Sequence, residues 1–231
     1  MSPLLLLYFT CVSAIANEAY VIQQKSKSSG VFLVYLNSNQ IKITYLQKKI
    51  EVYASKPDYK VTLINNKNKK YFVTTIPECL DVSGQGLVYK SFLVGGQHFK
   101  DKNYWLKTGT FKQDGIEALS YKFKYEKKYL QEPQTIENMS VGQFNGICQE
   151  FVELHSNLNG LPQMSSLILS ISAHDTVGNS FYIISTPSIK KQNMNIVKPC
   201  VSNYKLAKSY NDFNDLQVKS QAINDLINFT K

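Results

Sequence analysis

Short apolar runs separated by tight polar turns constrain the fold of this chain more than any other feature of its sequence. From residue 30 to residue 76 these runs are five or six residues long, the usual length of a β-strand. The connections between them are too short for a crossover helix, so neighbouring strands must run antiparallel. The strands predicted in this part of the chain are 31–36, 41–46, 50–54, 59–64 and 71–76.

Further strands are predicted in the second half of the chain. Residues 105–112 and 116–126 are expected to form a hairpin that turns at Gln113-Asp-Gly115. In its second arm apolar and polar residues alternate, which is the pattern of a strand with one buried face. Residues 167–171 and 181–186 are two more expected strands, joined by a polar turn at 175–179. No internal sequence repeat is evident.

Two stretches follow a helical period instead. The first is 140–155, where apolar residues recur every three or four positions behind Ser140, a suitable N-cap. The second is 211–229, where Asp212 and Asp215 occupy the first turn and favour the helix dipole. The expected fold is therefore α+β and mainly β, a curved antiparallel sheet packed with a few helices. We expect residues 17–231 to form one domain that ends in the helix at 211–229.

The first 16 residues have the features of a secretory signal peptide. An uncharged apolar run ends in Ala14-Ile-Ala16, a small-x-small cleavage pattern, and it is too short to span a bilayer comfortably. We therefore expect an exported protein, periplasmic or secreted, that begins at Asn17. Export permits disulfides, and the pairing predicted is Cys79 with Cys200, which leaves Cys148 as a buried free thiol on the apolar face of helix 140–155.

The net charge is +9, and every basic residue is lysine, because the chain has no arginine. Planar bidentate capture of phosphate, carboxylate or guanine is therefore excluded. Peripheral contact with anionic surfaces through Lys stays open, and it would be diffuse and sensitive to salt. Lysines alternate with aromatic residues near 121–129, but an amphipathic strand with lysines on its solvent-exposed face explains that pattern. We expect no nucleic-acid partner and a monomeric protein.

No catalytic or cofactor motif is present. The chain has no G-x-S-x-G, no phosphate-binding loop and no metal-ligand spacing, so neither a metal nor another cofactor is predicted. Its histidines are His98, His155 and His174. His174 precedes Asp175, and a carboxylate can orient an imidazole as a general base. Adjacent strand residues point to opposite faces, however, so the two side chains are not expected to pair, and a polar turn explains them better than a catalytic role does.

The order of these pieces resembles a known family. The run GVFLVYLNSNQIKITYLQKKIEVYASKPDYKVTLINNKNKKYFVTTI is followed by Trp105 ahead of Gly109 and Gly115, by Gly160-Leu-Pro162 and by Ser185-Thr-Pro-Ser188. Over about residues 25–205 this pattern is similar to exported bacterial proteins with a LolA-like half-barrel. The resemblance implies a curved antiparallel sheet against helices, with lipid acyl chains bound in an enclosed apolar cavity. The absence of arginine sets this chain apart from the lipoprotein carrier itself.

Three functional hypotheses remain open at this point. The first is a non-catalytic exported binding protein with an apolar cavity for a lipid, an acyl chain or a lipidated partner. The second is a structural or protein-interaction module with a filled core, and the third is an exported hydrolase. For the first hypothesis, the residues expected to line the cavity are Val31, Leu33, Tyr35, Ile43, Val61, Leu63, Tyr121 and Phe123.

Overall fold

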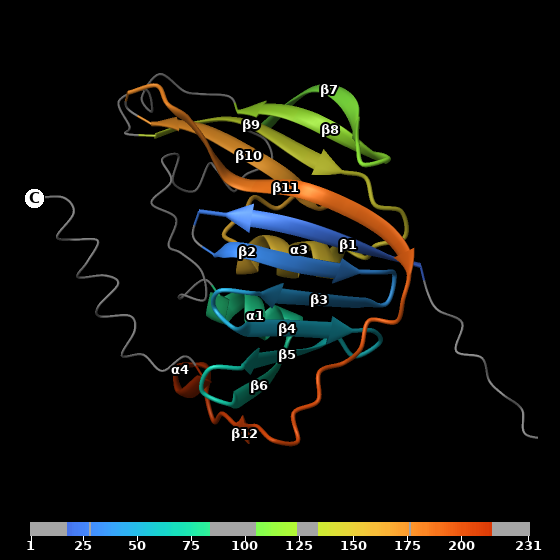
Figure 1. Cartoon of the computed structure of the whole chain (residues 1–231), viewed down its shortest axis with the longest axis vertical. Helices are drawn as coiled ribbons and strands as arrows, with labels where there is room; N and C mark the ends of the chain where they lie inside the picture. The colour runs from blue at the N-terminus through green and yellow to red at the C-terminus, as the bar shows by residue number, and fades with distance from the viewer. Residues whose placement is uncertain (1–17, 28, 84–104, 124–133, 176, 214–231) are drawn as a thin grey trace, which may run out of the picture.

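A computed structural model of the protein describes residues 18–27, 29–83, 105–123, 134–175 and 177–213. They form one 12-stranded sheet with the order β12-β6-β5-β4-β3-β2-β1-β11-β10-β9-β8-β7, which does not close into a barrel. Neighbouring strands in this sheet run antiparallel except for β12 and β6, which are parallel. Helices lie behind the sheet in the view of Figure 1. The predicted fold class, a mainly β antiparallel sheet packed with helices, is confirmed.

The first half of the sheet is a regular meander. It consists of β1 (Glu18–Ser26), β2 (Gly30–Leu36), β3 (Gln40–Tyr45), β4 (Ile50–Ser55), β5 (Lys60–Asn65) and β6 (Lys70–Thr75). The last four strands have six residues each and begin at 40, 50, 60 and 70. Strand and turn together thus repeat every ten residues, a repeat of geometry that the sequence alone did not reveal.

The three turns of this repeat share one backbone feature. Each ends in a residue with positive φ, which is Lys49 (55°), Tyr59 (49°) or Lys69 (56°). Left-handed backbone is costly for residues with a Cβ. The left-handed conformation occurs at the last residue of all three turns, because it directs the chain into the next strand in the correct register. The predicted strands of the meander are confirmed to within a residue or two, whereas β1 was not predicted.

The second half of the sheet is less regular. It consists of β7 (Trp105–Gln113), β8 (Ile116–Phe123), β9 (Gln134–Gly142), β10 (Ile168–Asp175) and β11 (Ser180–Asn193). Register shifts interrupt the pairings of β7 with β8, β9 with β10, and β10 with β11. Strand β11 pairs first with β10 and then with β1, so it joins the two halves (Figure 1). That second pairing also contains a shift, beside Gln24.

Helices α1 (Ile76–Ser83) and α3 (Gln149–Leu158) define the inner face of the sheet. The helix predicted to begin at Ser140 is corrected, because α3 begins after the extended N-cap Cys148 and residues 134–142 form β9. The Ser140 hydroxyl lies 2.6 Å from that of Ser170 on the neighbouring strand. Sheet pairing of these residues overrides the helical spacing in the sequence, and only the second half of the predicted stripe is helical.

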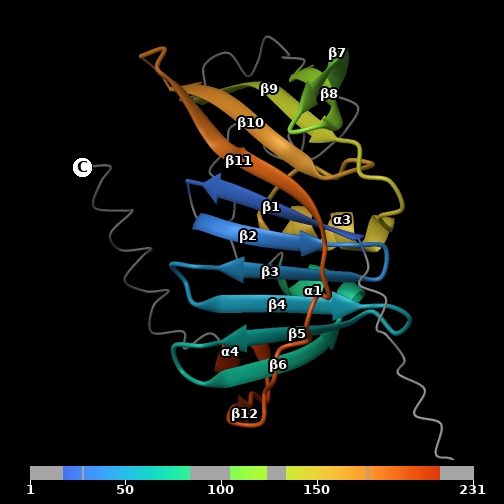
Figure 2. The same ribbon diagram turned by 45° about the vertical axis from the view of Figure 1, so that its right-hand side comes forward.

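A C-terminal strap, residues 194–213, covers part of the opposite, outer face. In Figure 2 it runs down across the first-half strands from β11 to β12 (Lys205–Leu206). Ile196 packs with Ala19 and Tyr53 in a small second core. The strap ends in α4 (Tyr210–Phe213), whose Phe213 is fully buried in the main core. The rest of the helix predicted at 211–229 lies outside the described residues.

The three described cysteines are free thiols. Cys79 is buried in the main core, whereas Cys200 is exposed on the strap and contacts the hydroxyl of Ser202 at 3.2 Å. The predicted Cys79–Cys200 bridge is therefore not formed, because one thiol is inside the core and the other faces solvent. Cys148 is free as predicted, but it is half-buried at the start of α3.

The described helices are too short and too polar to cross a bilayer. The predicted signal peptide, residues 1–16, lies outside the described residues.

Candidate functional site

The predicted cavity-lining residues do not share one face of the sheet. Ile43, Val61 and Leu63 point inward and are 0–1% exposed in the main core. Val31, Leu33 and Tyr35 are half-buried and alternate with the core residues of β2, so they lie on the outer face. Tyr35 packs against the second core beneath the strap. The structure thus separates these six residues by the thickness of the sheet.

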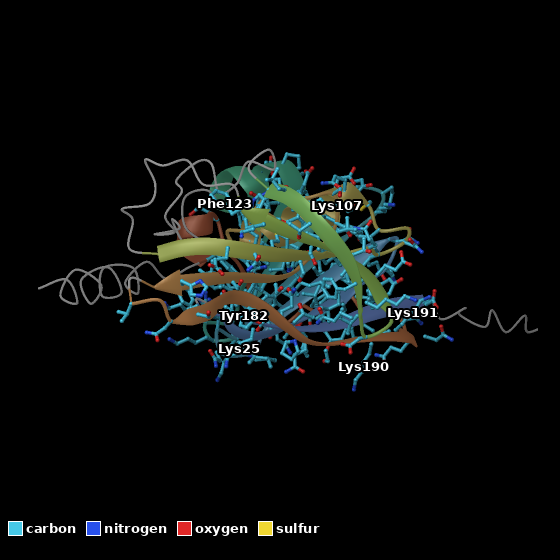
Figure 3. All side chains as sticks on the ribbon, turned by 90° about the horizontal axis from the view of Figure 1, so that it is seen from above. Lys25, Lys107, Phe123, Tyr182, Lys190 and Lys191 are labelled. Carbon is cyan, nitrogen blue, oxygen red and sulfur yellow. The ribbon has the colours of Figure 1, made fainter. Side chains whose placement is uncertain are left out.

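The last two predicted lining residues, Tyr121 and Phe123, lie on β8. Both pack with the main core. Tyr121 is half-buried and pairs across the strands with Met139, and Phe123 meets Trp105 edge to face with ring centroids 5.1 Å apart. Figure 3 shows Phe123 on the helix side of the sheet and Tyr182 on the outer side. These residues belong to the inner face of the second half.

The described helices cover mainly the first half of the inner face. Helix α1 packs against α3, β5 and β6. From α3, the ring of Phe151 lies 6.0 Å from that of Tyr59, and the ring of His155 lies 6.3 Å from that of Phe32. Both helices lie behind the first-half strands in Figures 1 and 2. The apolar inner face nevertheless continues through β9, β10 and β11.

A buried polar cluster joins the two halves. The Gln24 amide donates to the carbonyl of Ile168 at 2.8 Å and to the Thr186 hydroxyl at 3.0 Å. Since both amide hydrogens are used there, the Gln24 Oε1, 2.7 Å from His155 Nε2, accepts a hydrogen bond from the imidazole. Thr186 in turn donates to the carbonyl of Leu169 at 2.7 Å. The cluster thus fixes His155 as the Nε2–H tautomer.

His155 is fully buried, and its Nδ1 has no hydrogen-bond partner among the described residues. Burial lowers the pKa of His155 to about 3, because desolvation disfavours the charged imidazolium. The residue is therefore neutral at physiological pH. Its role in this cluster is to link α3 to the junction of β1, β11 and β10.

A second polar cluster lies on the outer face, at one end of the second half. His174 Nε2 is 2.7 Å from the hydroxyl of Ser180, and His174 Nδ1 is 3.0 Å from Glu137 Oε1. The approach to Glu137 is close but lies off the direction of a linear hydrogen bond. Ser180 is exposed, and the His174 and Glu137 side chains are 27% and 37% exposed. These three residues, the Ser180–His174–Glu137 cluster, come from three adjacent strands.

A β-bulge positions the carboxylate of this cluster. Asn138 pairs with Ser172, and Ile136 pairs with Ala173, so Glu137 is an extra residue in β9. Regular alternation would turn Glu137 toward the inner face, whereas the bulge brings it beside His174. Bulges commonly re-aim side chains in this way. Ser180 needs no such device, because it pairs directly with His174 across the β10–β11 hairpin.

The sequence signal for this cluster is partial. His174 stands out in the sequence because of its neighbour Asp175, whose side chain lies outside the described part of the chain, as does all of His98. A hairpin turning at 175–179 places residue 174 opposite residue 180, so the contact between His174 and Ser180 could have been predicted from the sequence. The contact between His174 and Glu137 could not, because it depends on a β-bulge.

A pocket of about 230 Å³ opens where the β7–β8 turn meets β1 and β11. It is lined by Tyr20, Gly115, Ile116, Glu117, Gln143, Asn145 and Lys191. The turn is held there by Asp114, which accepts a hydrogen bond from the Ile189 backbone at 2.8 Å. The pocket is smaller than the usual 300–1,000 Å³ of a ligand site, and its lining is mixed in polarity. It is not the apolar cavity that the sequence predicted.

Among the described residues, no group of three or more His, Cys, Asp or Glu side chains is arranged to hold a metal ion.

No family model and no curated protein matches this chain. Among solved structures, it is similar to an uncharacterized conserved protein from Thermus thermophilus, with a TM-score of 0.41 and 7% sequence identity. The likeness covers 83% of this chain and 90% of the other. At this level it carries no argument about function.

Proposed function

We propose that this protein binds a hydrophobic ligand, a lipid or an acyl chain or the lipid group of a modified partner, against the inner face of its open sheet. The observation that carries the proposal is an apolar inner face that extends across both halves of a sheet that does not close. The described helices pack mainly on one of these halves. The resemblance to LolA-like half-barrels points to the same class of ligand.

The second half of the inner face is the better place for such a ligand. In the first half Ile43, Val61 and Leu63 are sealed beneath α1 and α3, so a ligand would have to displace packed side chains there. Interiors at protein density have no room for an acyl chain. Tyr121 on β8 is only half-buried and packs against the main core, so a ligand could reach it at the border of the buried Phe123 and Met139. Each methylene buried there contributes about 0.8 kcal/mol.

The outer face has a different role in this proposal. Lys25 and Lys190 are exposed on β1 and β11, and Figure 3 shows both on the same side of the sheet as Tyr182, which is 61% exposed. Exposed ammonium groups beside an aromatic ring suit an anionic lipid surface. We infer that an exported carrier would approach such a surface from this side. Binding to anionic vesicles should then weaken as salt is added.

A single pair of variants tests the ligand proposal. Tyr121→Trp enlarges a half-buried inner side chain, and it should weaken binding of a fluorescent fatty acid by about tenfold, or about 1.4 kcal/mol. Leu33→Trp enlarges a half-buried outer side chain and should leave the affinity unchanged. Mass spectrometry of the native protein should also detect co-purifying lipid.

The alternative is an interaction module with a filled core, which the near-zero exposure of the main-core residues in both halves favours. In that case the parent protein binds no fatty acid and carries no lipid. Equal affinity in the parent and in Tyr121→Trp would likewise contradict the proposed ligand position. N-terminal sequencing of the protein from its native host tests export, with a start at Asn17 expected and an intact Met1 contradicting it.

A further inference from the structure

We propose that the Ser180–His174–Glu137 cluster is an esterase site on the outer face of the sheet. Its three groups stand in the order of a nucleophile, a general base and an orienting carboxylate, and that arrangement occurs on unrelated folds. The proposal goes beyond ligand binding at the inner face and does not depend on it, because the two sites lie on opposite faces of the sheet.

The proton positions follow from the contacts. Ser180 lies 2.7 Å from His174 Nε2, and Glu137 Oε1 lies 3.0 Å from Nδ1. A carboxylate beside Nδ1 favours the tautomer with its proton on that nitrogen. His174 Nε2 then holds a lone pair toward the Ser180 hydroxyl, which donates to it. Catalytic hydrogen bonds are often poorly aligned before substrate binds, as is the one to Glu137.

The location of the cluster favours chemistry over stability. Exposed ion pairs and hydrogen bonds contribute little to folding, and all three side chains are at least partly exposed. A bulge in β9 nevertheless places Glu137 on the face of His174. His155 shows the contrast, since it is sealed in the core and reaches no solvent. An ester can approach Ser180 directly, with Tyr182 two positions along the same face as an apolar platform.

The reaction is an acyl transfer to water. Ser180 Oγ attacks the ester carbonyl carbon while its proton moves to His174 Nε2, and the carboxylate of Glu137 stabilises the imidazolium. The bond to the leaving alkoxide breaks, and the alkoxide takes the proton from Nε2. Water then attacks the acyl-serine with His174 as base. The products are a carboxylic acid and an alcohol, and the Ser180 hydroxyl is restored.

The expected substrates are activated or exposed acyl esters. We assign no oxyanion-hole donors to the cluster, whose three residues lie in paired strands. Since one such donor accelerates acyl transfer by about 10²–10³, turnover should be slow and most easily seen with a good leaving group. p-Nitrophenyl butyrate is therefore a suitable substrate, and a fluorophosphonate is a suitable covalent probe.

The experiment compares the full-length protein with Ser180→Ala, His174→Ala, Glu137→Gln and the control Ser172→Ala, whose serine lies on the same face of β10. Intact-mass and peptide analysis should find one phosphonate on Ser180 of the parent and of Ser172→Ala. Ser180→Ala should abolish labelling, and His174→Ala should slow it by about 10²-fold or more. Glu137→Gln should slow it less and alter its pH profile. Melting temperatures should match throughout.

Two outcomes would overturn the proposal. One is a parent protein that takes no label on Ser180 after prolonged exposure to the probe. The other is p-nitrophenyl butyrate turnover that is the same in Ser180→Ala as in the parent. Neither outcome bears on fatty-acid binding at the inner face.

Discussion

Strands β1 to β6 and strands β7 to β11 differ in how closely their pairing follows a regular ladder. The five pairings within the first set contain no register shift, whereas three of the four pairings within the second set do. The first set is covered on its inner face by helices and partly on its outer face by the strap. The second set carries the outer-face polar cluster, whose carboxylate depends on a bulge.

This difference indicates a division of labour within one continuous sheet. Regular pairing with two covered faces suits a part of the molecule that supplies folding free energy. Bulges cost ladder hydrogen bonds but redirect side chains, so they suit a part that presents chemical groups. The two parts meet at the bulge beside Gln24, where the buried cluster of Gln24, His155 and Thr186 joins them.

The largest expected effect tests whether the first half supplies the stability. Phe32→Ala empties a fully buried site next to Tyr45, at a ring distance of 5.1 Å, and it should lower the free energy of unfolding by about 3–5 kcal/mol. Phe111→Ala removes the same side chain from β7, where it is 39% exposed, and should cost clearly less, about 1–2 kcal/mol, because only part of its apolar surface is buried. Denaturant unfolding measures both. If both variants lost a similar amount of unfolding free energy, the first half would not be the main source of stability.

An intermediate effect is expected at the junction when the pH is lowered. His155 has a pKa of about 3 when folded, against an ordinary value of 6.5, so between these values the unfolded chain binds more protons. Stability is therefore fully present above pH 6.5 and falls as the pH drops through this window, by up to about 1.4 kcal/mol per pH unit.

Unfolding measured from pH 6.5 to 5.5 emphasises this contribution, because Glu51 and Asp212, whose carboxyl pKa values are lowered from 4.5 and 3.8, are mostly ionised in both the folded and the unfolded chain over that range. His155→Gln keeps a donor for Gln24 without a titrating group, and it should flatten the pH dependence. An equally steep fall in the variant would assign the effect to other groups.

The smallest expected effect concerns the turns of the first half. Lys49 has left-handed backbone and is exposed, so Lys49→Gly should stabilise the protein by about 0.5–1 kcal/mol, since relief of Cβ strain outweighs the greater entropy loss of glycine. Lys60→Gly is the control, because this exposed lysine lies in extended β5; it should destabilise by about 0.5–1 kcal/mol. Thermal unfolding would reveal opposite signs. A loss in both variants would show that the turns are not strained at Lys49.

The regular half was largely predictable from the sequence, and the irregular half was not. Alternation in 41–46 indicated β3, and a short apolar run between polar turns at 59–64 indicated β5. Both predictions are confirmed because each strand pairs without a register shift. Strand β9 (Gln134–Gly142) was not predicted, because its bulge breaks the period of two. The helix predicted over 140–155 is wrong at its start, because the spacing of Phe144 to Leu154 extends the helical pattern backward from α3. Local periodicity thus fails where strand pairing determines the conformation.

The candidate sites show the same limit. Which face of a strand is buried depends on the neighbouring strands and helices. Leu33 and Ile43 were therefore both predicted to line one cavity, although they lie on opposite faces of the sheet. The pairing of His174 with Ser180 follows from a local hairpin. The contact of His174 with Glu137 requires a strand more than 30 positions earlier and one extra residue in it, which no pattern within a single strand encodes.

The position of β11 beside β1 also sets an order of events during folding. Gln24 and Thr186, bonded in the native sheet, are 162 positions apart, while β1 to β6 are joined by short turns that close within microseconds. The meander can therefore assemble as the chain emerges, but the edge of β1 must wait for the last long strand to be made. Until then that edge offers unpaired backbone groups to other chains. A chain terminated before β11 would therefore keep the edge of β1 unpaired and would be prone to aggregate through it.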